Sequence, residues 1–426
     1  MSNAKTTTRE WTIIGLLWGT QTVAHIIRVS LAVAAPTLMS LYHISPGVMG
    51  NVLAGWNWAY TACMLLVGPI VDHFGSFIVM GVGSGIWGLA TLALPVATTA
   101  LSLFLMRALF GFGHSMLIPA QAATISHWFG PDRRATAFGF CFSGGMVGLA
   151  IGSTVAAFVL NSLGWQAVFY CIGGVSLLLT LLWFVLYPDK KVGRKASLGQ
   201  TGVRAEMNRV PMPALLRHRS TWGIAFGQMG YLYAYFFFIT WLPGYLIMER
   251  KMSLLRTGLV GSLPFWMGMV GTIGGGMLGD HLMRRGLSRT ASRKGIIGTG
   301  LTLAMVMVVT AAFTEQTWLA VVLLTLCMGC MRTTTGSANC LPVDLAPPGA
   351  VGSLTSIQNF AGNVGGLLAP IVTGYIVQAT GSFVGALVTA GGMVMFGAMS
   401  YVFVVGRVEP LQIESARATL APQPAH

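Results

Sequence analysis

Charged residues are scarce in this chain. They make up 8% of its 426 residues, and only 11 residues are acidic, whereas a soluble domain carries about 25% charged residues. This supply cannot cover a water-facing surface of ordinary polarity, which excludes soluble enzymes, nucleic-acid-binding modules, disordered proteins and coiled coils. The shortage favours a protein surrounded mostly by lipid, with no nucleic-acid partner.

Groups of metal-ligating and nucleophilic side chains are also missing. The 6 cysteines lie in apolar stretches without the spacing of a disulfide framework. Cys327 and Cys330 form a close pair, but no second pair or nearby histidine completes a metal site. Aspartate, glutamate, histidine and cysteine do not gather at a membrane face as the catalytic cluster of an enzyme would. We therefore expect a protein that is not an enzyme and that binds no metal or cofactor.

Long apolar runs stand in place of charge. Hydrophobic residues make up 54% of the chain, and the runs do not alternate in polarity as the strands of a membrane β-barrel do. Because a helix needs about 20 apolar residues to cross a bilayer, the sequence predicts an all-α membrane protein with twelve transmembrane helices. The predicted spans lie near residues 12–40, 47–71, 76–98, 101–127, 136–162, 166–187, 220–247, 257–282, 295–314, 317–344, 351–378 and 382–406.

The spans fall into two six-helix halves. A polar segment at residues 188–219 separates an amino-terminal half, 1–187, from a carboxyl-terminal half with its tail, 220–426. Lysine and arginine concentrate in this central segment and in the loop between the eighth and ninth spans. By the positive-inside rule, both loops and both termini are cytoplasmic, so we expect a multi-pass protein of the inner membrane. A solvated polybasic loop beside anionic lipid accounts for the charge of the central segment.

A short motif repeats in the two halves. The second span ends in Gly68-Pro-Ile-Val-Asp72-His73, and the eighth ends in Gly276-Met-Leu-Gly-Asp280-His281. Parallel repeats of this kind are the arrangement of the major facilitator superfamily, whose substrate site lies between the halves near the midplane. We assign Asp72 and Asp280 gating or structural roles at the ends of their spans.

Three arginines lie inside predicted spans, where a charge costs at least about 3 kcal/mol. Arg28 is roughly 24 Å along the first helix, at about 1.5 Å per residue, and the spans offer almost no carboxylate to pair it. Its guanidinium fork suits a carboxylate, so we expect Arg28 to bind an anion. Arg332 precedes three threonines in the tenth span. It either grips the far end of a dianion held by Arg28 or bonds the carbonyls of a broken helix.

Two further polar residues lie in the fourth span. Arg107 is as suited to organising that helix as to touching a ligand. His114 lies 17 residues before Pro131, much as Arg332 lies 16 before Pro348, so the two occupy nearly symmetric places. A histidine on an apolar helix is often a core residue, but beside an anion site His114 is also a candidate proton carrier.

At these residues the chain resembles the anion:cation symporter family of the major facilitator superfamily, and most closely its bacterial galactonate-type branch. That family includes transporters of sugar acids, tartrate and phthalate, together with sialin and the vesicular glutamate transporters. The likeness covers nearly the whole chain. It is clearest in Arg28-Val-Ser-Leu-Ala-Val-Ala-Ala, Trp58-Ala-Tyr60-Thr, Gly68-Pro-Ile-Val-Asp72-His73-Phe-Gly75, Arg107 to Pro119, Trp128-Phe-Gly-Pro-Asp-Arg-Arg-Ala-Thr-Ala, Thr240-Trp-Leu-Pro-Gly-Tyr and Asn359-Phe-Ala-Gly-Asn. The resemblance implies that Arg28 and Tyr60 bind the substrate carboxylate, with polar contacts from Thr335 and Asn359.

The chain also departs from the family pattern. It has Ile27 where the family often has an acidic residue, and His114 where a glutamate is common; those two carboxylates are associated with proton coupling. Gly145 stands where the galactonate branch has a glutamine that contacts sugar hydroxyls, and Arg332 is an addition to that branch's pattern. The site is therefore more cationic, which favours a dianion such as a small or aromatic dicarboxylate.

These observations predict a secondary active transporter of an organic anion, working by rocker-switch alternating access. Taking up one negative charge against about 100 mV costs roughly 2.3 kcal/mol, so uptake requires a coupled cation or exchange. Proton symport with His114 as the carrier is the first hypothesis. An anion exchanger, an uncoupled facilitator or exporter, and an anion channel remain alternatives. We expect a monomer whose partners are the anion, protons and the lipid bilayer.

Overall fold

The computed structural model describes residues 8–129, 134–188, 212–347 and 350–412, and every regular element in these ranges is a helix. The first seven α-helices are α1 (Thr8–Tyr42), α2 (Pro46–Phe74), α3 (Ser76–Ala93), α4 (Ala100–Ser115), α5 (Leu117–Trp128), α6 (Arg134–Leu163) and α7 (Trp165–Leu186). The others are α9 (Met212–Leu216), α10 (Arg219–Thr240), α11 (Leu242–Gly244), α12 (Leu254–Val260), α13 (Leu263–Arg284), α14 (Arg289–Phe313), α15 (Thr317–Thr333), α16 (Thr335–Leu345), α17 (Val351–Thr380) and α18 (Val384–Met399). Short 3-10 or π-helical turns extend three spans: η1 (Leu94–Val96), η4 (Tyr245–Glu249) and η5 (Ser400–Val404).

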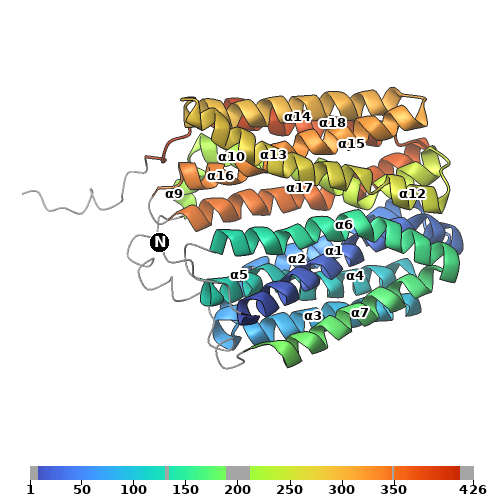
Figure 1. Ribbon diagram of the computed structural model, residues 1–426. Helices are drawn as coiled ribbons and strands as arrows, with labels where there is room; N and C mark the ends of the chain where they lie inside the picture. Colours follow the sequence, from blue (N-terminus) through green and yellow to red (C-terminus); the bar gives the residue numbers. More distant parts are fainter. Residues whose placement is uncertain (1–7, 130–133, 189–211, 348–349, 413–426) are drawn as a thin grey trace, which may run out of the picture.

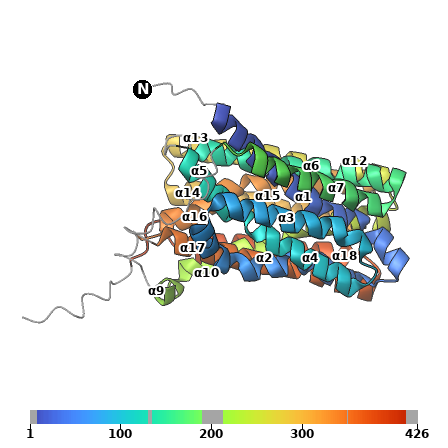
Figure 2. The same ribbon diagram turned by 90° about the horizontal axis from the view of Figure 1, so that it is seen from below.

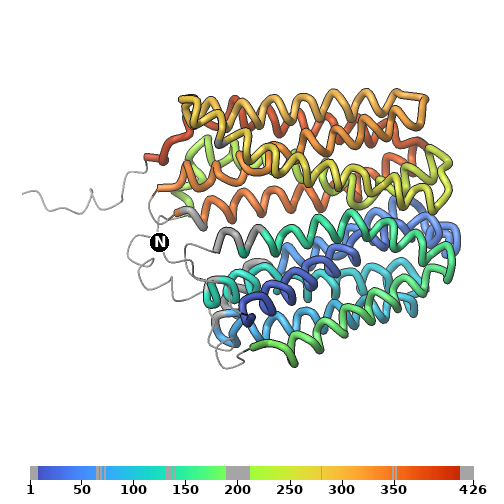
Figure 3. The backbone as a smooth tube through the Cα atoms, viewed as in Figure 1, coloured from blue at the N-terminus to red at the C-terminus, as the bar shows by residue number. Residues whose placement is uncertain are grey.

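The helices form two bundles that lie side by side (Figure 1). In the first, α1 packs on α6, α2 on α4 and α3 on α7; in the second, α10 packs on α17 and α18, and α14 on α15 and α18. Figures 2 and 3 show the long helices of both bundles running between the same two ends. The predicted all-α membrane fold with two six-helix halves is therefore confirmed. Residues 189–211, most of the predicted central segment, lie outside the described ranges.

Nearly all predicted spans are long and apolar enough to cross a membrane. Among the described residues nine helices meet this condition, and a tenth does so when α10 and the α11–η4 segment, bent by 51° at their junction, count as one span. The other two predicted spans coincide with α2 and with the α12–α13 pair. The chain is thus a multi-pass membrane protein.

The fourth and tenth spans break at equivalent places. The junction residues are Met116, with φ −75° and ψ −20°, and Thr334, with φ −79° and ψ −18°. His114 and Arg332 each lie two positions before their junction, which agrees with the near symmetry predicted from the loop prolines. The Thr334 hydroxyl donates to the carbonyl of Met331 at 2.7 Å, a local bond that competes with the helical ladder and bends helices.

The two bundles contact each other toward the end at which α1 leads into α2. The amide of Gly47 donates to Gln378 Oε1 at 3.1 Å, and Asn57 Nδ2 donates to the carbonyl of Asn363 at 2.9 Å. These bonds join the first half of α2 to the middle and the carboxyl-terminal end of α17. Thr154 of α6 donates to the carbonyl of Gly258 in α12 at 2.9 Å.

Two glycines allow the close approach of α2 and α17. A Cβ atom at Gly50 would meet the backbone oxygen of Pro370, and one at Gly374 would meet the backbone oxygen of Pro46. Backbone atoms cannot swing aside as the tip of a flexible side chain can. A methyl group at either position must therefore push the two helices apart.

We predict that Gly50→Ala opens this end of the interface. Overpacking costs about 1–3 kcal/mol, enough to shift an equilibrium between closed and open forms by about tenfold or more. Spin labels at His43 and Thr380, in a cysteine-free background, should report a longer distance in the variant. Gly392→Ala is the control, because a Cβ there meets nothing within 4 Å. Identical distance distributions for Gly50→Ala and the parent would contradict the packing argument.

Candidate functional site

A cavity of about 600 Å³ lies between the two bundles. Residues from both halves line it, about half of them apolar or aromatic and about half polar or charged. They are Gln21, His25, Arg28, Trp56, Tyr60, His114, Ile118, Phe142, Ser143, Met146, Leu232, Tyr235, Phe236, Met269, Thr272, Ile273, Arg332, Thr335, Asn339 and Asn363, together with Gly145. This is the size and the lining that a small-molecule site requires.

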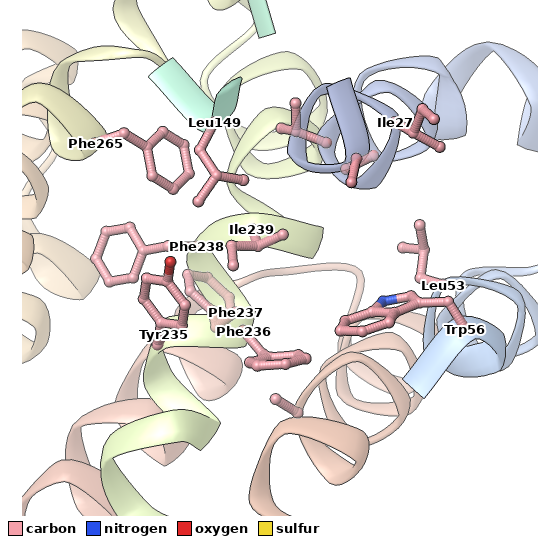
Figure 4. Packing of buried hydrophobic residues seen from close by; sticks show 14 of the residues in the cluster. Ile27, Leu53, Trp56, Leu149, Tyr235, Phe236, Phe237, Phe238, Ile239 and Phe265 are labelled. Carbon is pink, nitrogen blue, oxygen red and sulfur yellow. The ribbon is translucent and has the colours of Figure 1, made fainter. Parts of the chain in front are cut away.

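Arg28 lies on α1 against two aromatic faces. Its Cζ is 4.2 Å from the ring centre of Trp56 and 5.4 Å from that of Phe236. The two rings stack with centroids 5.5 Å apart and planes 11° from parallel, as Figure 4 shows. Trp56 belongs to α2 and Phe236 to α10, so the aromatic pair that faces Arg28 also joins the halves. Cation–π contacts of this kind stabilise a guanidinium by about 0.5–2 kcal/mol without neutralising its charge.

Arg332, in the carboxyl-terminal half, is held by neutral side chains of its own half. Its Nε donates to the Thr272 hydroxyl and its Nη1 to the Tyr231 hydroxyl, each at 3.1 Å. The Tyr231 hydroxyl also bonds Thr335 Oγ1 at 3.0 Å. Among the described residues, the hydrogen-bond partners of Arg332 are side chains, not the backbone carbonyls that the alternative interpretation required.

The cavity lining carries positive charge and no carboxylate among the described residues. Tyr235 lines the same cavity as Arg28 and Arg332, and the Cζ of Arg332 is 5.4 Å from its ring centre. A salt bridge elsewhere in the described chain, Arg293 to Asp344 at 3.3 Å, joins α14 to α16. Two guanidinium groups that face one cavity without a counter-charge create a site for an anion.

His114 is enclosed by rings. Trp56, Tyr60, Trp87, Phe110 and His25 surround it, with centroid distances of 5.4 to 6.1 Å. Both ring nitrogens lack a hydrogen-bond partner within the described chain, although the side chain borders the cavity. The proton-carrier role of His114 remains a prediction.

The other predicted site residues separate into two groups. Tyr60 and Thr335 line the cavity as expected, whereas Asn359 does not; Asn363, one turn further along α17, takes its place. Arg107 is 1% exposed and lies outside the lining, with its Cζ 5.3 Å from the ring of Phe110, which favours an organising role in α4. The side chains of Asp72 and Asp280 lie outside the described part of the structure.

Sequence reasoning overlooked His25. Its Nε2 lies 3.3 Å from Arg28 Nη1, and its Nδ1 lies 2.8 Å from the carbonyl oxygen of Gln21. Spacings of three and four residues place side chains on one face of a helix. The polar positions Gln21, His25 and Arg28 in an otherwise apolar first span carried that signal.

We predict that Trp56→Ala lowers thermal stability far more than Trp58→Ala. Trp56 is 2% exposed and packs on both Arg28 and Phe236, whereas Trp58, two residues along the same helix, is 50% exposed. Removing a buried tryptophan costs about 3–5 kcal/mol, and an exposed one much less. The Tm of each variant is measured in detergent, with loss of the monodisperse gel-filtration peak on heating as the readout. Equal losses would show that the aromatic pair does not hold the halves together.

Comparison with known proteins agrees with this architecture. Residues 17–292 match the family model described as Major Facilitator Superfamily. The D-galactonate transporter of Escherichia coli O6:H1 is 31% identical, over 95% of this chain and 98% of that protein. The "Probable galactarate/D-glucarate transporter GarP" of Escherichia coli K12 is 31% identical, over 91% and 92% of the two chains.

A solved structure shows the same fold. The bacterial homolog of the human lysosomal transporter Spinster, inward-facing and unoccupied, superposes with a TM-score of 0.75, covering 94% of this chain and 95% of that one at 17% identity. These relatives are transporters rather than enzymes. The repeated loop motif, the paired six-helix bundles and a family model that matches most of the chain lead to one conclusion: this chain belongs to the major facilitator superfamily.

Proposed function

We propose that this protein is a secondary active transporter of an organic anion, a carboxylate, that works by rocker-switch alternating access. One observation carries the proposal: Arg28 and Arg332, one from each half, face the same cavity, and no carboxylate among the described residues lines it. A carboxylate is the ligand that a guanidinium fork binds in a bidentate manner. The relatives named for sugar-acid transport support the same class of substrate.

A dicarboxylate fits this arrangement best. Arg28 of the first half and Arg332 of the second place positive charge on two sides of the cavity, so a dianion can neutralise both. Thr335 and Asn339 of α16 and Asn363 of α17 supply neutral polar contacts along the cavity. One relative is named for galactarate and D-glucarate, which are six-carbon diacids, and another for D-galactonate, a monoacid. The second arginine supports the diacid.

Coupling to protons follows from the energetics of a charged substrate. Each negative charge moved inward against about 100 mV costs roughly 2.3 kcal/mol, which a co-transported proton offsets. We place the protein in the inner membrane with both termini cytoplasmic, on the charge of its loops, and we propose that it is a monomer. A buried histidine of the cavity carries the proton, and His114 is the candidate that the sequence indicates. Exchange for another anion and uncoupled passage are the competing modes.

Arg28→Ala is expected to abolish stabilisation by carboxylates. Purified protein in detergent is screened by thermal shift against D-glucarate, D-galactonate, succinate and phthalate at pH 5.5 and 7.5. The wild type gains Tm with at least one acid, because binding to the folded state stabilises it. Arg256→Ala, at an exposed position of α12, is the matched control and keeps the full gain. An unchanged gain in Arg28→Ala would refute the carboxylate assignment.

Arg332→Ala is expected to weaken D-glucarate far more than D-gluconate. The two acids share a carbon chain and differ in one terminal carboxylate. Their comparison therefore isolates the carboxylate that Arg332 is proposed to bind. A hydrogen bond to a charged group is worth about 1.5–3 kcal/mol, so the affinity for the diacid falls about 10- to 100-fold by calorimetry. Equal losses for both acids would return Arg332 to a structural role.

A further inference from the structure

His25 lines the cavity directly beside Arg28. Its imidazole lies between Gln21 and Arg28 on α1: Nδ1 contacts the carbonyl oxygen of Gln21, and Nε2 faces Nη1 of Arg28. A carbonyl only accepts and a guanidinium only donates. In this state the ring is therefore neutral, with its proton on Nδ1, and its Nε2 lone pair accepts from Arg28.

The packing around His25 is built for this ring. A Cβ atom added at Gly145 would lie 3.0 Å from its Cε1, and one added at Gly148 would lie 3.0 Å from its Cβ. The α6 helix thus presents bare backbone to the imidazole and leaves the ring edge open to the cavity. A side chain at position 145 would displace the ring from Arg28.

The charged and titratable groups facing His25 include no carboxylate from the described chain. Arg28 comes from its own helix, and His114 of α4 approaches with ring centroids 6.1 Å apart. Tyr60 of α2 contacts the His114 ring, and Tyr235 of α10 lies across the same cavity. The positive charge of Arg28 therefore disfavours a protonated His25 until an anion binds in the cavity.

We propose that His25 binds the coupling proton together with the substrate carboxylate. The carboxylate binds the guanidinium of Arg28. This breaks the hydrogen bond from Arg28 Nη1 to His25 Nε2 and frees the Nε2 lone pair. A proton from the buffered solvent then bonds to Nε2, and the resulting imidazolium N–H donates a hydrogen bond to a carboxylate oxygen. One proton is bound per substrate molecule, at the carboxylate that Arg28 holds. No covalent bond within the substrate changes, and neither the proton nor the substrate binds as well alone.

His114 is less suited to this step. Its two nitrogens have no partner among the described residues, and aromatic rings surround it. The inference rests on the proposed carboxylate transport and assigns the proton uptake of that transport to His25. It also supplies a reason for the absence of an acidic residue before Arg28, since a histidine one turn earlier performs the linkage.

Calorimetry with D-glucarate tests the assignment. Titrations of the purified protein at pH 7.5 in buffers of different ionisation enthalpy count the protons taken up on binding. The wild type is expected to take up roughly one proton per glucarate. His25→Gln, whose amide oxygen can still accept from Arg28, is expected to bind glucarate with uptake near zero. His114→Gln distinguishes the two histidines of the cavity and is expected to take up a proton as the wild type does. His127→Gln, at an exposed position of α5 outside the cavity, is the matched control.

Three results would overturn the proposal, and they are distinguishable. Wild-type protein that binds glucarate without taking up a proton refutes the linkage without any variant. Full uptake in His25→Gln together with its loss in His114→Gln moves the proton to His114. Wild-type protein that gives no binding heat with glucarate removes the carboxylate function and this inference together. If His25→Gln does not fold, His114→Gln still decides. Loss of proton uptake in that variant moves the site to His114, and an unchanged count leaves it on His25.

Discussion

Uncompensated positive charge in a low-dielectric interior is the constraint on which the rest of this structure depends. Arg28 and Arg332 line a cavity without a carboxylate from the described chain, and an isolated buried charge is costly unless something polarisable or ionic faces it. Aromatic faces meet this need for Arg28, and hydroxyl groups meet it for Arg332. Neither kind of partner removes the charge. An anionic substrate does, so binding completes the electrostatics of the protein interior.

The same residues tie the site to the relative placement of the halves. Trp56 stacks on Phe236 across the interface, and the ring that supports Arg28 is therefore also a contact between bundles. Arg332 of the second half reaches Met146 of α6 in the first, with Nη2 3.6 Å from the sulfur. A rotation of one half against the other must rearrange these contacts. In the proposed alternating access, these contacts couple occupation of the cavity to the conformation of the transporter.

Much of the fold could be predicted from the sequence. A membrane-spanning helix is a long apolar run, so a hydropathy profile shows both its position and its length. The exact places of the breaks inside spans could not be predicted. The threonines after Arg332 favour a broken helix, but which hydroxyls bond backbone carbonyls, as those of Ser115 and Thr334 do, depends on the folded structure. Arg28, Arg332 and His114 were identifiable because a polar group in a span is costly. Which neighbours face them depends on helix rotation and packing, so Trp56 could not be separated from Trp58, and Asn359 was expected where Asn363 lies.

The most direct measurement of the central claim is a structure of the protein determined with D-glucarate bound. The account predicts the diacid in the cavity between the halves, with one carboxylate within hydrogen-bonding distance of Arg28 and the other within reach of Arg332. Glucarate bound at a place that touches neither arginine would contradict the account, because the two guanidinium groups would then not serve to bind the substrate.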